Sequence, residues 1–339
     1  MLNRNYIFPF FISLSGYVFM VSMDTVIKVL GSNYPILQLL FLNALFSLIP
    51  LTFFIIKNHG MQFYINQNYK FWELIVIDNN SKNNVLKIIK KKKNNKIKYY
   101  NINNGGIIGK SRNLGIKKSK YTWIAFLDSD DFWYRDKLLE IKKKIIKDKS
   151  DFFYHNMHIY SRKKKFLKKK LYSNFRNQFK KKFDDLVING NDIIQSSVVV
   201  KKNLVKKVGY ISEDRNLVAW EDFDLWLKIS SITNKFNRIN KCLGKYFISE
   251  NKKEKHNRFI NNIKHFKKKY KTSINKIMTK YDLKEIWWIQ YAKGLDDYNR
   301  GRLNKAKKKL DKIKINNNWI KLNIAYIKFK IFLKQIIKR

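Results

Sequence analysis

Cysteine, proline, glycine and acidic side chains are all scarce in this chain of 339 residues. The single cysteine, Cys242, excludes a disulfide within the chain, and no cysteines and histidines cluster at the spacing of a zinc site. A lone thiol fits a reducing compartment. Only three prolines and twelve glycines argue against long flexible linkers between domains.

The shortage of acids leaves an extreme charge, with 72 Lys and Arg against 25 Asp and Glu and a formal net charge of +47. Three explanations are open: nucleic-acid binding, attraction to an anionic membrane surface, or a composition bias with no specific function. Lys, Asn and Ile dominate nearly every segment, which favours the composition bias, with the membrane second. No compact basic-aromatic motif of an RNA- or DNA-binding module is present, so no specific nucleic-acid partner is expected.

Residues 1–57 are apolar, whereas the remainder is basic. The runs at 6–29 and 34–56 each reach the length of about 20 residues that a membrane helix needs. Lys and Arg follow in excess, which predicts that the remainder lies on the cytoplasmic side. The sequence therefore predicts a transmembrane helical hairpin over 1–57 and a location at the inner (cytoplasmic) membrane.

Within this stretch, residues 23–32 and 34–43 resemble the first two helices of the EamA family of drug and metabolite transporters. The resemblance covers only two helices of a fold that has many, and two helices cannot form a transport pathway. It leaves one alternative function for the chain: a truncated transporter-type membrane protein fused to a non-catalytic domain.

Beyond residue 62, short strand patterns alternate with helix patterns, which predicts an α/β domain over 62–250 with a mostly parallel sheet. Residues 71–78 read as a strand that ends in Asp78. Residues 123–127 read as a buried strand that ends in an acidic cluster, Asp128, Asp130 and Asp131. Carboxylates crowded at the end of a buried strand repel one another unless a cation or ligand lies among them. In open α/β sheets this end of the strand is where ligands bind.

Four pieces in order carry a second resemblance: 67–78, 111–116, 126–133 and 195–228. Together they resemble a family 2 glycosyltransferase. The resemblance implies a GT-A (Rossmann-like) fold and transfer of a sugar from a nucleotide-diphosphate donor to a cell-envelope glycan or lipid-linked acceptor. It also implies that Asp130 binds Mg²⁺ or Mn²⁺ and that Asp128 faces the donor ribose. An N-cap cluster before a helix at 132–146 is the alternative for the acids.

Four further residues receive roles from the same resemblance. Asp78 would contact the base, unless it is only an Asx-turn residue. Arg112 would reach the donor phosphate or ribose, unless it is an ordinary surface arginine. Asp222 would be the general base of an inverting reaction, oriented by Glu221, unless both acids simply complement a helix dipole.

One part of the family pattern is missing, because membrane-type sequence replaces the first strand and its base-binding loop. The predicted sheet therefore lacks a strand between the one ending at Asp78 and the one ending at Leu127, and the donor site is expected to be impaired. Residues 52–56 could supply that strand only by shortening the second membrane helix below spanning length. We favour the helix.

The chain from 255 to 339 reads as a basic helical region. Residues 286–295 and 303–313 predict a helical hairpin, and 319–337 predict an amphipathic helix with apolar residues and lysines interleaved. That last helix could pack on the domain or lie on an anionic bilayer, and both alternatives stay open.

Overall fold

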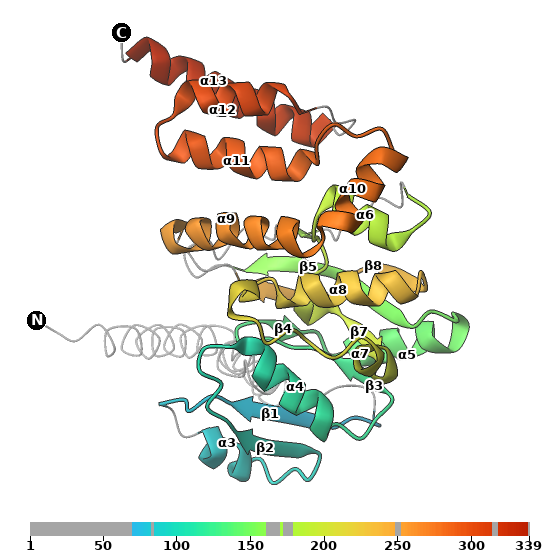
Figure 1. Cartoon of the computed structure of the whole chain (residues 1–339). Helices are drawn as coiled ribbons and strands as arrows, with labels where there is room; N and C mark the ends of the chain where they lie inside the picture. The colour runs from blue at the N-terminus through green and yellow to red at the C-terminus, as the bar shows by residue number, and fades with distance from the viewer. Residues whose placement is uncertain are drawn as a thin grey trace, which may run out of the picture. The chain divides into compact units, whose positions relative to one another are not determined.

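The computed structural model describes residues 70–82, 85–160, 170–171, 179–247, 252–313 and 318–337 (Figure 1). All of them belong to one of two units, Gln67–Arg339. The membrane hairpin expected at 1–57 lies outside the described residues and stays a prediction. Within the described ranges, no helix combines the length and the apolar character needed to cross a bilayer.

The strands are β1 (Leu74–Asp78), β2 (Ile97–Asn101), β3 (Trp123–Ala125), β4 (Phe132–Trp133), β5 (Phe152–Tyr160), β6 (Lys170–Leu171), β7 (Val199–Lys201) and β8 (Phe236–Phe247). The α-helices are α3 (Val85–Lys91), α4 (Ile108–Lys118), α5 (Lys137–Lys147), α6 (Lys182–Asn189), α7 (Lys202–Lys207), α8 (Glu221–Ile232), α9 (Lys252–Lys269), α10 (Lys271–Lys280), α11 (Trp287–Asn299), α12 (Leu303–Asp311) and α13 (Asn318–Ile337).

The strands form two separate sheets rather than one. β1 and β2 make a parallel pair, and the second sheet has the order β3-β7-β5-β8-β4 with β6 beside β5. In the part of the chain that is described, no strand joins β1 to β3, which is where the sequence predicts a missing strand. The expected α/β class is confirmed, while the missing strand itself would have to come from residues outside these ranges.

The prediction of a mostly parallel sheet is wrong for the larger sheet. Only β5 and β8 pair in parallel there, while the β3–β7, β5–β7, β4–β8 and β5–β6 pairs are antiparallel. Alternating strand and helix patterns give the order of the elements but not the direction of each strand. An antiparallel neighbour needs no crossover helix between partners, so these pairings leave no helical signature in the sequence.

Both faces of the larger sheet are covered by helices. On one face Phe152 packs edge-on against Trp226 of α8, with ring centroids 4.9 Å apart, and both side chains are fully buried. On the other face Phe153 belongs to a second core cluster with Ile141 of α5. This burial on both sides explains why the first half of β5 carries a continuous run of large side chains rather than an alternating pattern.

Helix α4 contacts both the small sheet and the loop that precedes α8. Gly115 lies against Ile77 of β1, where an added Cβ would be 3.5 Å from the isoleucine side chain. Gly109 approaches the backbone more closely, since a Cβ there would lie 2.3 Å from the carbonyl oxygen of Ser212. Only glycine permits that contact. The helix that carries Arg112 is thereby held against residues about one hundred positions later in the chain.

The C-terminal helices confirm the expected helical region. α11 and α12 pack together as the predicted hairpin, and α13 corresponds to the helix predicted at 319–337. Aromatic rings from α8, α9 and α11 pack together where these helices meet the domain, including Phe223, Phe266 and Trp288. Leu303, Ala306 and Leu310 of α12 form a separate core cluster with buried isoleucines of α13.

Candidate active site

The three acids after β3 lie in different environments. Asp131 is buried, and its carboxylate accepts a hydrogen bond of 2.8 Å from the backbone N–H of Phe247. Burial raises the pKa of Asp131 to about 6, partly offset by hydrogen bonds from Ser196 and Phe247. Asp130 is exposed, and Asp128 is half-buried. Asp131 therefore fastens the loop to β8, while Asp130 presents its carboxylate to solvent.

The alternative in which these acids cap a helix is wrong. The helix expected from residue 132 begins only at Lys137, because Phe132 and Trp133 form strand β4 instead. The residue at the N-cap position of α5 is Asp136, and its side chain makes no capping hydrogen bond.

Ser196 holds the acidic loop in place from a neighbouring 3₁₀ turn. Its hydroxyl accepts a 2.9 Å hydrogen bond from the backbone N–H of Asp128. Its carbonyl oxygen accepts hydrogen bonds from Trp133 Nε1 at 2.8 Å and from Lys137 Nζ at 2.7 Å. Burial lowers the pKa of Lys137 well below its usual range, although Asp131 opposes the shift. The sequence gives no sign of these contacts, because the Ser196 hydroxyl binds a backbone N–H and the Lys137 side chain binds a backbone carbonyl.

Arg112 joins the acidic loop to α8. Its guanidinium donates to Asp128 Oδ1 at 2.6 Å and to Glu221 Oε1 at 2.5 Å, across sequence separations of 16 and 109 residues. Burial alone would lower the pKa of Arg112, but the carboxylates of Asp128 and Glu221 raise it above its usual value. The alternative of an ordinary surface arginine is wrong, since the side chain is only 15% exposed.

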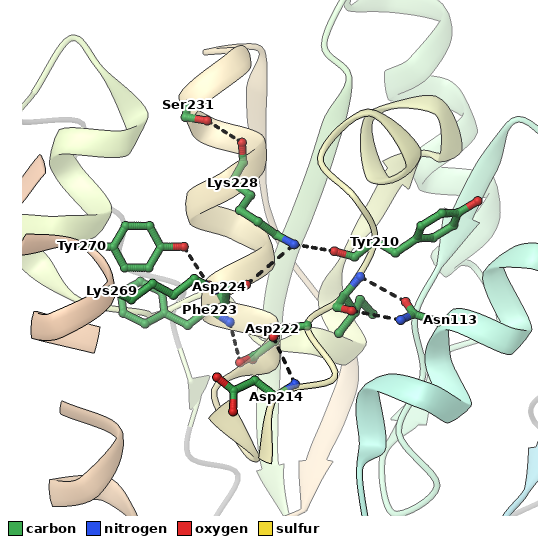
Figure 2. Close-up of polar contacts among 12 residues, drawn as sticks. Asn113, Tyr210, Asp214, Asp222, Phe223, Asp224, Lys228, Ser231, Lys269 and Tyr270 are labelled. Carbon is green, nitrogen blue, oxygen red and sulfur yellow. Dashed lines mark hydrogen bonds and ion pairs between the residues drawn. The ribbon is translucent and has the colours of Figure 1, made fainter. Parts of the chain in front are cut away.

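Glu221 and Asp222 begin α8, next to the loop that contains Asp214 (Figure 2). Asp222 Oδ1 accepts from the backbone N–H of Phe223 at 2.6 Å, and Asn191 Nδ2 lies 3.4 Å from Oδ2. Burial raises the pKa of Asp222 to about 7, Glu221 adds to the shift, and Arg112 opposes it.

Two observations set this pair of acids apart. A carboxylate with a pKa near neutrality suits a general base, whereas an acid that only complements a helix dipole needs no such shift. The second oxygen of Glu221, Oε2, is buried and accepts no hydrogen bond within the described ranges. Buried polar atoms are usually satisfied, so a buried oxygen without a hydrogen bond is unusual for an acid that serves the fold alone.

Asp78 lies at the C-terminal end of β1, and its contacts are local. It accepts hydrogen bonds from the backbone and hydroxyl of Ser81 and from the hydroxyl of Tyr99 at 2.8 Å. The Ser81 hydroxyl and the Tyr99 hydroxyl lower its pKa, and burial opposes them. The backbone contact with Ser81 is the kind of turn that the alternative interpretation expects. Within the described residues, no hydrogen bond or ion pair joins Asp78 to Arg112 or Asp128. A base-binding role stays a prediction.

The neighbouring residue, Asn79, does connect this strand end to α4. Asn79 Oδ1 accepts from the backbone N–H of Asn104 at 2.8 Å, and Asn104 Nδ2 donates to Ser111 Oγ at 2.8 Å. Ser111 directly precedes Arg112. A chain of two hydrogen bonds thus runs from the end of β1 to the helix that carries the arginine.

Two further residues fix α4 and α8, and Figure 2 draws both. Asn113 exchanges hydrogen bonds with the backbone of Ile211, donating at 2.9 Å and accepting at 3.0 Å. Asp224 accepts from Lys269 Nζ at 2.5 Å and from the Tyr270 hydroxyl at 2.7 Å, which fastens α8 to the helices that follow the sheet. Neither role was predicted, although Asn113 and Asp224 both lie inside pieces that carry the family resemblance.

Asp130 and Asp128 are the residues that fit a hard divalent cation. Within the described ranges, no group of three His, Cys, Asp or Glu side chains converges on one point. Mg²⁺ is commonly held by one or two carboxylates together with substrate phosphates, so a full cage of protein ligands is not required. An exposed carboxylate beside a second one matches that pattern.

Comparison with known proteins connects this arrangement to a family. Residues 63–209 match the family model Glycosyl transferase family 2. An uncharacterized glycosyltransferase of Rickettsia conorii is 30% identical over 191 residues, which cover 54% of this chain and 29% of that protein. The Escherichia coli enzyme UDP-Glc:alpha-D-GlcNAc-diphosphoundecaprenol beta-1,3-glucosyltransferase WfgD is 27% identical over 186 residues, covering 50% of this chain and 62% of that protein.

Among solved structures, residues 1–349 of Staphylococcus aureus TarS cover 74% of this chain and 75% of that chain, with a TM-score of 0.45 and 17% identity. The chain spans less than a third of the length of the Rickettsia proteins that it matches. None of these matches supports the transporter resemblance of residues 23–43, which stays a prediction.

The matched residues include the acidic loop after β3 and Arg112. Glu221, which the same arginine contacts, lies beyond them in α8. Residues 63–209 therefore match a family 2 glycosyltransferase domain, and relatives named glycosyltransferases are similar to about half of this chain.

Proposed function

We propose that the chain transfers a sugar from a nucleotide-diphosphate donor to a lipid-linked or cell-envelope glycan acceptor. The observation that carries this proposal is the ion triad Asp128–Arg112–Glu221, in which Arg112 and Glu221 are largely buried and Asp128 is half-buried. It joins Asp128, expected at the donor ribose, to Glu221, expected beside the acceptor, although the two lie 93 positions apart in the sequence. Such a link supports one continuous site rather than two unrelated surface clusters.

The proposed chemistry assigns a step to each side of the triad. Asp222, with its pKa near 7, removes the proton of the acceptor hydroxyl, and that oxygen attacks the anomeric carbon. The bond to the nucleoside diphosphate breaks on the opposite side, so the anomeric carbon inverts. Glu221, held in place by Arg112, orients Asp222 or the acceptor.

Asp130 and Asp128 lie at the donor end of the proposed site. They would hold a divalent cation, Mg²⁺ or Mn²⁺, which when bound supplies positive charge that stabilises the leaving diphosphate. Arg112 keeps Asp128 oriented and offsets part of the negative charge of the two carboxylates that it contacts.

The class of acceptor and the location follow from a relative and from the sequence. The name of the Escherichia coli relative gives UDP-glucose as its donor and a sugar on diphosphoundecaprenol as its acceptor. We extend the class of both substrates, and not their identity, to this chain. A lipid-linked acceptor also agrees with the membrane hairpin predicted at 1–57, which would keep the catalytic domain at the cytoplasmic face of the inner membrane.

The separation of the two sheets bears on activity. A donor base would bind near the ends of β1 and β3, and no described strand fixes these two strands side by side. We therefore propose that the donor binds more weakly than in a relative with an unbroken sheet, because binding must also order the two edges.

A turnover assay tests the proposed reaction. The full chain is incubated with Mn²⁺, a panel of nucleotide sugars including UDP-glucose, and N-acetylglucosamine linked to diphosphoundecaprenol, and release of nucleoside diphosphate is measured. We expect acceptor-dependent release that falls at least about 100-fold in Asp130→Ala, because the leaving diphosphate loses its charge stabilisation.

Asp136→Ala is the matched control, since Asp136 is an exposed acid a few residues away whose side chain makes no capping hydrogen bond. It should retain wild-type turnover. Release that does not depend on an acceptor, or equal rates in the Asp130 and Asp136 variants, would contradict the proposal.

A further inference from the structure

Helix α13 has two apolar faces, and only one of them is covered. Ile324, Ile327 and Ile331 are buried against α12, and this contact anchors the helix to the α11–α12 hairpin. The residues of the opposite face are large, apolar and exposed. They are Leu322 (69% exposed), Tyr326 (56%), Phe329 (57%), Phe332 (56%), Leu333 (41%) and Ile336 (53%), which we call the α13 outer face.

The α13 outer face is a single stripe rather than scattered exposure. Five of its members follow one another at intervals of 4, 3, 4 and 3 residues, which places them along one side of an α-helix, and Phe332 borders them. Six of the 14 exposed large hydrophobic side chains among the described residues lie on this one helix. Isolated exposed leucines need no explanation, but a contiguous apolar patch usually marks an interaction surface.

Lysines border the stripe on both sides. At about 100° per residue, Lys330 and Lys334 fall on one flank, and Lys321 and Lys328 fall on the other. Lys330 Nζ lies 4.4 Å from the ring centroid of Tyr326, and Lys328 pairs with Asp311 of α12. The helix itself contains no Asp or Glu.

The charges on α13 indicate which of two partners would cover the α13 outer face: a second copy of the chain or an anionic lipid surface. A second copy of the chain, laid stripe to stripe, would bring lysine flanks together with no acid on α13 to pair with them. An anionic lipid surface complements the same lysines and accepts the apolar stripe between them. Tyrosine, as at Tyr326, is enriched at membrane–water interfaces, and phenylalanine, as at Phe329 and Phe332, is common on the apolar face of interfacial helices.

We propose that the α13 outer face is a docking surface for an anionic bilayer, on which the helix lies parallel to the membrane plane. The buried isoleucines hold α13 on its hairpin, so the apolar stripe enters the headgroup boundary without the helix leaving the protein. The proposal rests on α13 alone and does not depend on the sugar-transfer reaction.

A site-specific probe tests this surface in the full chain. Because Cys242 is the only cysteine, Phe329→Cys in a Cys242→Ser background accepts a single environment-sensitive fluorophore. The protein is placed in vesicles of phosphatidylcholine with or without phosphatidylglycerol. We expect a blue shift and at least about a twofold rise in emission only with phosphatidylglycerol, reversed by Lys330→Gln with Lys334→Gln.

Ile146→Cys in the same background is the matched control, since Ile146 is an isolated apolar residue of α5 that is 72% exposed. Its fluorophore should not respond, even if another part of the chain brings the protein to the vesicle. Three results would overturn the proposal: no response at position 329, an equal response in neutral vesicles, or a response without lipid that grows with protein concentration. The last would indicate a second copy of the chain.

Discussion

Replacing Arg112 with leucine is expected to lower the free energy of unfolding by about 3–5 kcal/mol, the range found when one partner of a buried ion pair is removed. The guanidinium contacts Asp128 and Glu221 at 2.6 and 2.5 Å. The Glu221 side chain is only 6% exposed, and its other oxygen has no hydrogen bond in the described part of the chain. Without Arg112 this carboxylate would be buried with no positive charge beside it. Chemical denaturation of both proteins measures the difference.

Two companion variants separate charge from packing. Adding Glu221→Gln to Arg112→Leu removes the stranded charge, and we expect it to recover about half of the lost stability. Arg112→Lys should give an intermediate loss, because a single ammonium cannot reproduce the two-armed contact of the guanidinium. A loss below about 1 kcal/mol in Arg112→Leu, or a double variant that is less stable than the single one, would contradict the stabilising role of this triad.

Asp222→Asn is expected to reduce sugar transfer by about 100- to 10,000-fold, the range that general base catalysis contributes. The asparagine amide keeps the size and shape of the carboxylate, but it cannot take the proton from the hydroxyl of the acceptor. Donor affinity should be unchanged, because Asp222 has no assigned contact at the donor end. A rate within a factor of about ten of the wild type would exclude Asp222 as the base.

The same residue predicts a pH dependence of both rate and stability. With its pKa near 7, Asp222 is protonated and inactive below that pH, so the wild-type rate should fall on the acid side of pH 7. In the unfolded chain the carboxyl ionises near its ordinary value of 3.8. Between pH 4 and pH 7, Asp222 is ionised in the unfolded chain but still protonated in the folded one. The free energy of unfolding therefore falls as the pH rises from about 4 to about 7.

Asp222→Asn removes that cost. It should therefore be more stable than the wild type at pH 8 by about 1 kcal/mol or more, and no more stable at pH 4. This expected gain in stability is smaller than the pKa difference alone would give, because Asp222 is partly exposed and water screens its charge. Thermal melts of the two proteins at both pH values measure the effect, and an equal difference at pH 4 and pH 8 would contradict it.

The sequence predicted the chemistry-bearing residues better than their surroundings. Arg112, Asp128 and Glu221 were proposed to serve one reaction because their pieces occur in a family order, and the structure brings the three side chains into contact. The strand at 71–78 and the hairpin at 286–313 were likewise expected from their patterns and correspond to β1 and to α11 with α12. Strong local periodicity is the signal that such predictions use.

The parts that were missed depend on tertiary contacts. Ser196 supports Asp128 with a hydroxyl and receives Lys137 with a carbonyl, and a serine in a polar turn gives no sign of either role. Strand β4 replaced the first turn of a predicted helix because Phe132 pairs with Lys245 of β8, more than one hundred residues away. Strand direction in the larger sheet depends on the same kind of long-range pairing, which local sequence does not encode.

Binding of a nucleotide sugar at the acids after β3 is the step on which the proposed reaction depends. Calorimetric titration of UDP-glucose and other nucleotide sugars into the full chain, with and without Mn²⁺, measures this directly. We expect saturable binding of at least one donor that requires Mn²⁺, is lost in Asp130→Ala and persists in Asp136→Ala. Absence of saturable binding in the wild type, or equal binding by the Asp130 variant, would contradict it.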